Sequence, residues 1–350
     1  MSALKRRFAA VALTASVAPY CASAEFEVLD QNYSDGRKAP VEIYLSGDIT
    51  PSTPSDFLDL VLKKKITKAT VYLDSNGGDL MAGMELGGHI RKAGFNTSIG
   101  KAGPSYGRAA IGKCQSSCVL TLIGGYFRFA ERGSIIGIHR FYRQSRTAGA
   151  QDLDVAQVLS AQITSYLIKM GTDPALFERM VRVARGRMES LPLAEAAKLN
   201  VINNGMLPAD WTIEGKGGQV YMRGQQETWL GTGKLLFTCA PGNNIQVSAM
   251  YDAGSNTQKI AREAVNYSLR LDSRFIPVAS PELRDRPSVS GDYLVATLRP
   301  SSPLAESMRH ASQIGFAFHP ANSGEFFGYL IDAQPQREMI QSFINHCRTI

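Results

Sequence analysis

The sequence lacks several patterns that would tie it to metal or nucleotide chemistry. Its five cysteines form no CxxC pair, the spacing typical of zinc sites, so we expect no bound metal. Neither the Walker nor the GxGxxG spacing occurs, which disfavours a phosphate-binding loop. We find no internal repeat and no low-complexity segment. The sequence therefore predicts a protein without a metal or an organic cofactor.

Long apolar runs are also missing, because no stretch reaches the roughly 18 uninterrupted apolar residues that a membrane helix needs. The N-terminus has basic Lys5-Arg6-Arg7, a short apolar run over 8–17, and the small-residue site Ala22-Ser23-Ala24. This order is typical of a secretory signal peptide over 1–24, cleaved after Ala24; the alternatives are a frayed helix or an uncleaved anchor. We expect a periplasmic or secreted protein with no stable membrane span after cleavage.

The charge balance gives little sign of a nucleic-acid partner. The net charge is +7, of which Lys5, Arg6 and Arg7 supply three. The densest basic run beyond them, Lys63-Lys64-Lys65, is explained by a solvated helix end. No nucleic-acid recognition motif accompanies it, so we expect no such partner.

Four cysteines remain after cleavage of the expected signal, namely Cys114, Cys118, Cys239 and Cys347. An even number in an oxidising compartment favours disulfides, and four cysteines allow three connectivities. The spacing favours Cys114–Cys118 and Cys239–Cys347, because each pair then falls within one expected domain.

The apolar pattern predicts an α/β domain over 41–210 that follows an N-terminal extension over 25–40. Short β-branched runs alternate there with segments of helical spacing, which favours mainly parallel strands. The expected strands are 41–45, 69–73 and the strand-like pair 201–202. The expected helices are 54–64, 80–92, 152–170, 174–185 and 195–199.

From about residue 211 the composition shifts towards Thr, Tyr, Val and turn residues. We expect strands at 234–239, 245–248 and 293–298, and a final helix over 336–346. Residues 211–350 are thus predicted to form a smaller, mainly-β domain of unknown role.

Ser116 and His139 are the candidate catalytic pair of the first domain. A serine hydroxyl is a poor nucleophile unless a base lies within hydrogen-bond reach and donors stabilise the oxyanion. Ser116 precedes the apolar run 119–123, where free N–H groups of a buried helix could hold an anion. The simpler interpretation is that Ser116 or Ser117 caps that helix. His139 ends the apolar stretch 135–138, and could equally be a structural histidine.

A glycine turn, Asn76-Gly77-Gly78, lies between an expected buried strand and an expected helix. Backbone N–H groups in such a turn can approach a bound carbonyl, where a side chain would obstruct. A plain strand-to-helix turn would look the same.

Several of these segments resemble, in order, the caseinolytic (Clp) protease proteolytic subunit of the Clp/crotonase superfamily. Residues 74–84, DSNGGDLMAGM, are similar to that family's NSPGGxxxAGM. Residues 114–118 look like its nucleophile turn, 122–141 like the stretch leading to its histidine, and 194–202 like its closing segment. The resemblance covers about residues 41–206. It implies a ββα superhelix for the first domain and assembly of the chain into a homo-oligomer.

Carried over by residue, the resemblance implies Ser116 as nucleophile and His139 as general base, with the N–H groups of Gly78 and Ser117 as the oxyanion hole. The family's aspartate position falls near Met188, beside Glu189. Either Glu189 orients the histidine, or a Ser-His dyad operates, or the site is degraded. The resemblance therefore implies an exported serine peptidase acting on short or unfolded peptides. The alternatives are an inactive scaffold that binds partners, and an acyl-thioester enzyme of the crotonase type, which export disfavours because coenzyme A is cytoplasmic.

Overall fold

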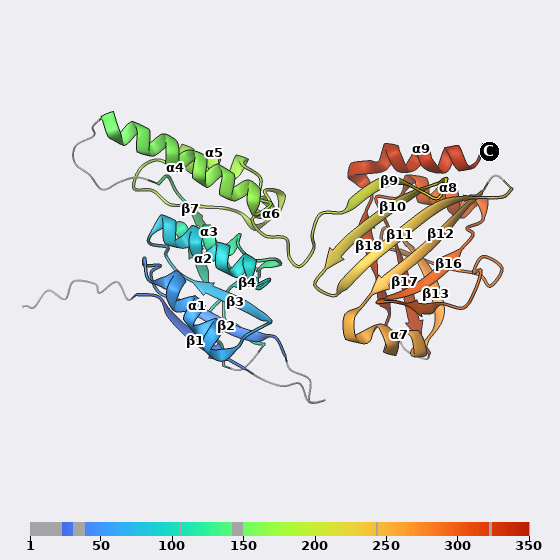
Figure 1. The fold of residues 1–350 in the computed structure, drawn as a ribbon, viewed down its shortest axis with the longest axis horizontal. Coiled ribbons are helices and arrows are strands. Elements are labelled where there is room, and N and C mark those ends of the chain that lie inside the picture. Colours follow the sequence, from blue (N-terminus) through green and yellow to red (C-terminus); the bar gives the residue numbers. More distant parts are fainter. Residues whose placement is uncertain are drawn as a thin grey trace, which may run out of the picture. The chain divides into compact units, whose positions relative to one another are not determined.

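The computed structural model of the chain describes residues 23–30, 39–104, 107–141, 150–242, 244–321 and 324–349. The chain divides into two compact units between Ile202 and Asn203 (Figure 1). Most of the expected signal peptide, residues 1–22, lies outside the described residues, as does 31–38 of the expected extension. Within the described ranges, no helix has both the length and the apolar character that crossing a bilayer requires.

The first unit contains a five-stranded sheet in the order β1-β2-β3-β4-β6. Its strands are β1 (Glu25–Leu29), β2 (Val41–Ser46), β3 (Ala69–Asp74), β4 (Asn96–Ile99) and β6 (Arg128–Ala130). β2, β3, β4 and β6 pair in parallel, whereas β1 pairs antiparallel with β2. The helices α1 (Thr53–Lys64) and α2 (Leu80–Lys92) connect the parallel strands. β3 is the central strand of this sheet, with Ala69, Val71 and Leu73 buried, and the turn that follows it reaches the surface at Asn76 and Gly78.

Aromatic packing fixes α1 on this sheet. Phe57 of α1 is fully buried, and its ring centre lies 5.9 Å from that of Phe26 and 6.4 Å from that of Phe95. Burying such a side chain contributes about 1.5–3 kcal/mol. Lys65 ends the helix in a left-handed conformation, φ 53°, so the basic run 63–65 occupies an exposed helix end.

A second, three-stranded sheet of the first unit carries the segments of the candidate site. It consists of β5 (Lys113–Gln115), β7 (Ile135–Ile138) and β8 (Glu189–Ser190), with β7 in the centre. The short helix α3 (Ser117–Leu122) follows β5 after one residue. The remaining helices are α4 (Ala150–Lys169), α5 (Ala175–Arg182) and α6 (Leu193–Lys198). α4 packs on α3 through Tyr166, whose hydroxyl donates to the Leu120 carbonyl at 2.7 Å.

Two sequence expectations differ from this structure. The segment 25–40 is not only an extension, because β1 adds a strand to the main sheet; its apolar Phe26 and Val28 alternate with glutamates and face the core. The strand expected at 201–202 is wrong. Val201 instead donates its N–H to the Ala196 carbonyl at 2.8 Å, so the chain turns there at the end of α6. Both residues are apolar because they are buried, not because they pair.

The second unit is mainly β. A six-stranded antiparallel sheet runs in the order β15-β16-β12-β11-β10-β9, and a four-stranded one in the order β14-β13-β17-β18. The six strands are β9 (Asp210–Lys216), β10 (Gln219–Thr228), β11 (Gly231–Ala240), β12 (Asn244–Asp252), β15 (Ser288–Ser290) and β16 (Tyr293–Leu298). The four are β13 (Ala264–Leu271), β14 (Arg274–Pro277), β17 (Gln313–Pro320) and β18 (Phe327–Asp332). The α-helices are α7 (Thr257–Glu263), α8 (Ser302–His310) and α9 (Arg337–Cys347).

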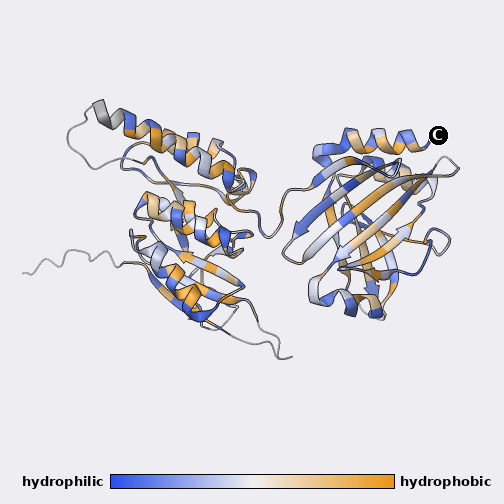
Figure 2. Ribbon diagram, viewed as in Figure 1, coloured by the Kyte–Doolittle hydropathy of each residue, from blue (hydrophilic) through white to orange (hydrophobic). Residues whose placement is uncertain are grey.

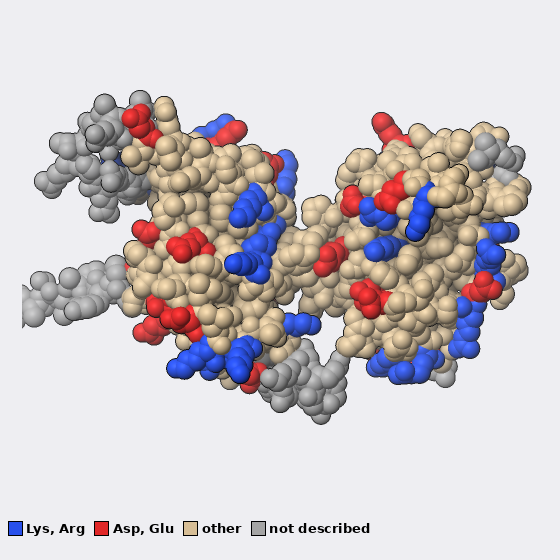
Figure 3. All heavy atoms as spheres, viewed as in Figure 1, with Lys and Arg blue, Asp and Glu red and all other residues tan. Residues whose placement is uncertain are grey.

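Hydrophobic and hydrophilic residues alternate along several strands of the second unit (Figure 2). In β12 the pattern has period two: Ile245, Val247, Ala249 and Tyr251 are buried and the residues between them are not. Such alternation is expected of strands with one face on a core. On the face drawn in Figure 3, charged side chains of both signs are scattered over each unit.

Candidate active site

The glycine turn after β3 packs directly against the serine turn after β5. Gly77 and Gly78 have φ angles of 100° and 143°, in the region that favours glycine. A Cβ on Gly77 would lie 2.6 Å from the Cβ of Ser116, and one on Gly78 would lie 2.1 Å from the Ile49 carbonyl oxygen. Only glycine at position 77 therefore allows the two turns to approach this closely, and only glycine at 78 fits against the Ile49 backbone.

Ser116 occupies the turn between β5 and α3 in an unusual backbone conformation, with φ 57° and ψ −128°. For a residue with a side chain this is a strained region that costs about 1–3 kcal/mol. Its N–H donates to the Gly137 carbonyl at 2.8 Å, which ties the turn to β7. Its side chain makes no capping hydrogen bond to α3, so the simple capping interpretation does not describe Ser116.

His139 lies immediately after β7 and meets Ser116. Its Nε2 lies 2.6 Å from the Ser116 Oγ, and its Nδ1 lies 2.7 Å from the carbonyl oxygen of Arg140. A carbonyl oxygen only accepts, so Nδ1 carries the proton and Nε2 is left to accept from the serine hydroxyl. This is the tautomer in which an imidazole can act as a base towards Ser116.

The backbone N–H groups of Gly78 and Ser117 have no hydrogen-bond acceptor among the described residues. Ser117 is the first residue of α3, where the N–H groups have no partner within the helix. A Cβ on Gly77 would lie 3.0 Å from the Ser117 nitrogen, so the glycine turn abuts this amide. Ser116, His139 and the Ser117 N–H thus lie together, and Gly78 directly follows the glycine that packs against Ser116 and Ser117.

Glu189, one of the residues considered for orienting the histidine, lies elsewhere. Its Oε1 is 2.7 Å from Arg179 Nη2 and 2.9 Å from Arg179 Nε. Arg179 also pairs with Glu195. The antiparallel register of β7 and β8, extended by one residue, sets Met188 opposite His139. The position expected to hold an acid is therefore occupied by the thioether side chain of Met188. The hydrogen-bond partner of His139 Nδ1 is the Arg140 carbonyl.

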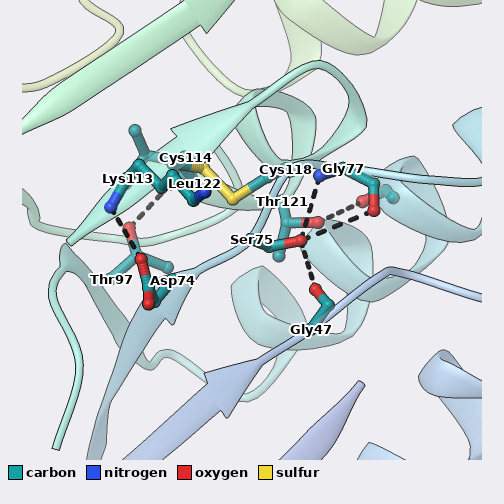
Figure 4. The surroundings of a disulfide bond; sticks show 11 residues. Gly47, Asp74, Ser75, Gly77, Thr97, Lys113, Cys114, Cys118, Thr121 and Leu122 are labelled. Atoms are coloured by element: carbon teal, nitrogen blue, oxygen red, sulfur yellow. Dashed lines mark hydrogen bonds between the residues drawn. A yellow bond between two sulfur atoms is a disulfide. The ribbon is translucent and has the colours of Figure 1, made fainter. Parts of the chain in front are cut away.

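Disulfides join the two cysteine pairs that the spacing favours, and Figure 4 shows the surroundings of Cys114–Cys118. Cys114–Cys118 bridges β5 and α3 on either side of Ser116, with Cα atoms 5.2 Å apart. Cys239–Cys347 ties β11 to α9 in the second unit. Within the described residues no group of three or more His, Cys, Asp or Glu side chains could hold a metal ion.

Two arginines hold the far end of α3. Arg128 is 2 % exposed and donates to the carbonyls of Ile123 and Met170 at 3.3 and 3.0 Å. Arg91 donates to the carbonyls of Ile123, Gly124 and Gly125 at 2.8–3.0 Å. Burial, and secondarily the neighbouring Arg91 charge, lower the pKa of Arg128 to about 10. Cations are favourable at a helix C-terminus, so this pair anchors the helix whose first turn carries Ser117.

Sequence reasoning missed the Arg140 carbonyl, the Arg91 and Arg128 pair and the bridging role of Ser75 described below. All of these contacts use backbone atoms, which every residue has. Arg128 lies within 122–141, the stretch that resembles the one leading to the family's histidine. The one available signal was the arginine itself in a mostly apolar stretch, since a buried guanidinium needs several acceptors.

No protein-family model and no curated protein matches the sequence. Among solved structures, the chain is similar to a mutant of ClpP1 from Listeria monocytogenes, at 16% identity and a TM-score of 0.34, over 46% of this chain and 88% of the other. It is also similar to a mutant of the 1510-N membrane-bound stomatin-specific protease, at 19% identity and a TM-score of 0.33, over 45% of this chain and 75% of the other.

Proposed function

We propose that the first unit is a serine hydrolase that cleaves peptide bonds and uses a Ser116–His139 dyad. The observation that carries this proposal is the 2.6 Å contact between Ser116 Oγ and His139 Nε2, made by a serine held in a strained turn. A serine that only capped α3 would have no need of either feature.

In the proposed mechanism, Ser116 Oγ attacks a substrate carbonyl while His139 Nε2 takes the hydroxyl proton. The negative charge that develops on the carbonyl oxygen is stabilised by the N–H groups of Gly78 and Ser117. His139 then gives the proton to the leaving group, and a water repeats the sequence to release the acyl group.

The orienting group for His139 is a backbone dipole in this proposal. The Arg140 carbonyl fixes the tautomer through Nδ1, but it cannot neutralise the imidazolium as a carboxylate would. Replacing the aspartate of a full triad can cost about 10⁴-fold in turnover. We therefore expect slow hydrolysis relative to full-triad enzymes, and a preference for reactive or fully accessible bonds.

The proposed setting is outside the cytoplasm, on short or unfolded peptides. The disulfide that joins the cysteines on the two sides of Ser116 is compatible with an oxidising compartment. The N-terminal sequence has the pattern of a secretory signal. Assembly of identical subunits, implied by the family resemblance, is part of the same proposal. So is a role for the second unit in binding substrates or partners.

The direct test is labelling of the purified chain with a fluorophosphonate probe, which reacts with activated serines. We expect labelling at Ser116, its loss in Ser116→Ala, and a strong reduction in His139→Gln. Ser117→Ala is the matched control, because it removes the adjacent buried hydroxyl and keeps the backbone N–H. Labelling that persists in Ser116→Ala would refute the proposal.

A non-catalytic scaffold that binds peptides is the second candidate. It is favoured by one observation: Met188 is opposite His139, while Glu189 is engaged by Arg179. A wild-type chain that folds but takes up no probe, and that binds unfolded peptides without cleaving them, would support this candidate.

A further inference from the structure

Ser75 is a buried serine that the proposed mechanism does not use. It lies between the end of β3 and the glycine turn and is 1 % exposed. Its side chain and its backbone together make hydrogen bonds to three separate segments of the first unit. Figure 4 shows those of the side chain, to Gly47 and Gly77. A buried residue with this many partners links the positions of those segments.

The Ser75 hydroxyl holds the peptide that precedes the oxyanion amide. Its Oγ accepts from the Gly77 N–H at 3.0 Å and donates to the Gly47 carbonyl at 2.6 Å. The Gly77 carbonyl in turn accepts from the Ile49 N–H at 2.8 Å. Gly77 is therefore fixed at both ends, and the next N–H, that of Gly78, is left without an acceptor among the described residues. Two successive glycines have wide conformational freedom, so their direction depends on such anchors.

The Ser75 backbone ties the same turn to the strand before the nucleophile. Its N–H donates to the Lys113 carbonyl at 2.8 Å, and its carbonyl accepts from the Gln115 N–H at 3.0 Å. The Asp74 Oδ1 also accepts from the Lys113 N–H at 2.9 Å. Gln115 leads directly into Ser116. One residue thus contacts both the oxyanion turn and the nucleophile turn.

We propose that Ser75 is a positioning residue that sets the Gly78 amide relative to Ser116 Oγ; this inference rests on the proposed hydrolase function. Oxyanion donors act only when they point at the place where the charge develops. Loss of the Ser75 hydroxyl frees the Asn76–Gly77 peptide, so the Gly77–Gly78 peptide that carries the Gly78 N–H is then held by Ile49 alone and can shift. The chain keeps its nucleophile and its base but stabilises the transition state less well.

The test is the kinetics of fluorophosphonate labelling in Ser75→Ala, separated into a binding constant KI and a maximal rate kinact. Removing one oxyanion donor costs about 10²–10³-fold, so misaligning one is expected to lower kinact by roughly 10- to 100-fold. KI is expected to stay within about two-fold, because Ser75 is buried away from the probe. Ser75→Thr keeps the hydroxyl and should recover most of kinact.

Ser98→Ala is the matched control. Ser98 is a buried serine of β4, and its side chain makes no hydrogen bond within the described part of the chain. Its loss should leave both constants unchanged. Circular dichroism of each variant shows whether the chain is folded at the assay temperature.

A folded Ser75→Ala with wild-type kinact would overturn the inference. If that variant does not fold, glycine-selective ¹⁵N labelling of the wild type decides. Slow hydrogen exchange at Gly77 and fast exchange at Gly78 is expected; exchange at Gly77 as fast as at Gly78 would show that Ser75 does not hold it. The proposed function fails separately, through labelling that does not depend on Ser116.

Discussion

Replacing both cysteines of the second-unit disulfide by alanine should destabilise that unit by an amount that can be calculated. Cys239 and Cys347 are 108 residues apart. A cross-link closing a loop of this length lowers the entropy of the unfolded chain and so raises its free energy by about 4.7 kcal/mol. For a unit the size of Asn203–Ile350, this corresponds to a melting temperature lowered by roughly 15 °C. Alanine is preferred because Cys347 is fully buried, and a serine hydroxyl there would add an unsatisfied group.

Tryptophan fluorescence reports this unit selectively. The sequence has two tryptophans, Trp211 and Trp229, and both lie in the second unit. Trp211 is buried; its ring centre lies 6.1 Å from that of Phe237, and its indole N–H donates to the Asp332 carbonyl at 2.7 Å. Unfolding should therefore change its emission strongly, while unfolding of the first unit is silent.

The matched control is Cys114→Ala with Cys118→Ala, which removes the other disulfide and should leave the tryptophan transition where it is. A reducing agent should lower the wild-type midpoint to that of the Cys239→Ala, Cys347→Ala chain. A shift below about 3 °C on removing Cys239–Cys347 would show that the link hardly constrains the unfolded chain, contrary to the loop-entropy calculation.

Three further predictions concern the two turns and the response to acid. Gly77→Ala should abolish fluorophosphonate labelling, because its Cβ would lie 2.6 Å from that of Ser116, whereas Gly88→Ala on α2 should label normally, since nothing lies within 4 Å of that Cβ. Replacing Cys114 and Cys118 by alanine should slow labelling roughly ten-fold. The short disulfide loop contributes about 2 kcal/mol, which helps to hold the Ser116 turn against a strain of about 1–3 kcal/mol. An unchanged rate would mean that the hydrogen bonds alone hold this turn. Hydrogen bonds from Arg309, His310 and Arg348 lower the pKa of Glu306 to about 2, so its ionised form stabilises the second unit above about pH 4.5 and loses this effect as the pH falls towards 2. The tryptophan midpoints of wild type and Glu306→Gln should accordingly differ at pH 7 and converge near pH 2, and a constant difference would contradict this.

The sequence predicts those helices and strands in which the spacing of apolar residues and the turn residues at the ends indicate the same element. Residues 69–73 are β-branched and aromatic and end at a glycine turn, and the structure has β3 at Ala69–Asp74. Residues 80–92 keep helical spacing up to a glycine, and the structure has α2 at Leu80–Lys92. The short strands β5, β6 and β8, of two or three residues each, are below the length at which a period can be read. These strands form because adjacent strands of the folded unit hydrogen-bond to them.

The candidate site shows the same division. The type and order of the residues predict Ser116 and His139 as a candidate pair, because nucleophilic chemistry needs those side chains. Their meeting at 2.6 Å depends on how β5 and β7 pair, which the sequence does not specify. The pair 201–202 failed for the opposite reason, since two buried apolar residues give the same signal in a strand and in a buried turn.

The two disulfides differ in when they can form as the polypeptide is made. Cys114 and Cys118 are four positions apart, so this bond can close as soon as a short stretch of chain has emerged, and all the segments around Ser116 that precede α4 are made soon afterwards. Cys239 has no partner until α9 has been synthesised. Biosynthesis therefore allows the segments around Ser116 and His139 to assemble before the last helix of the second unit has been made.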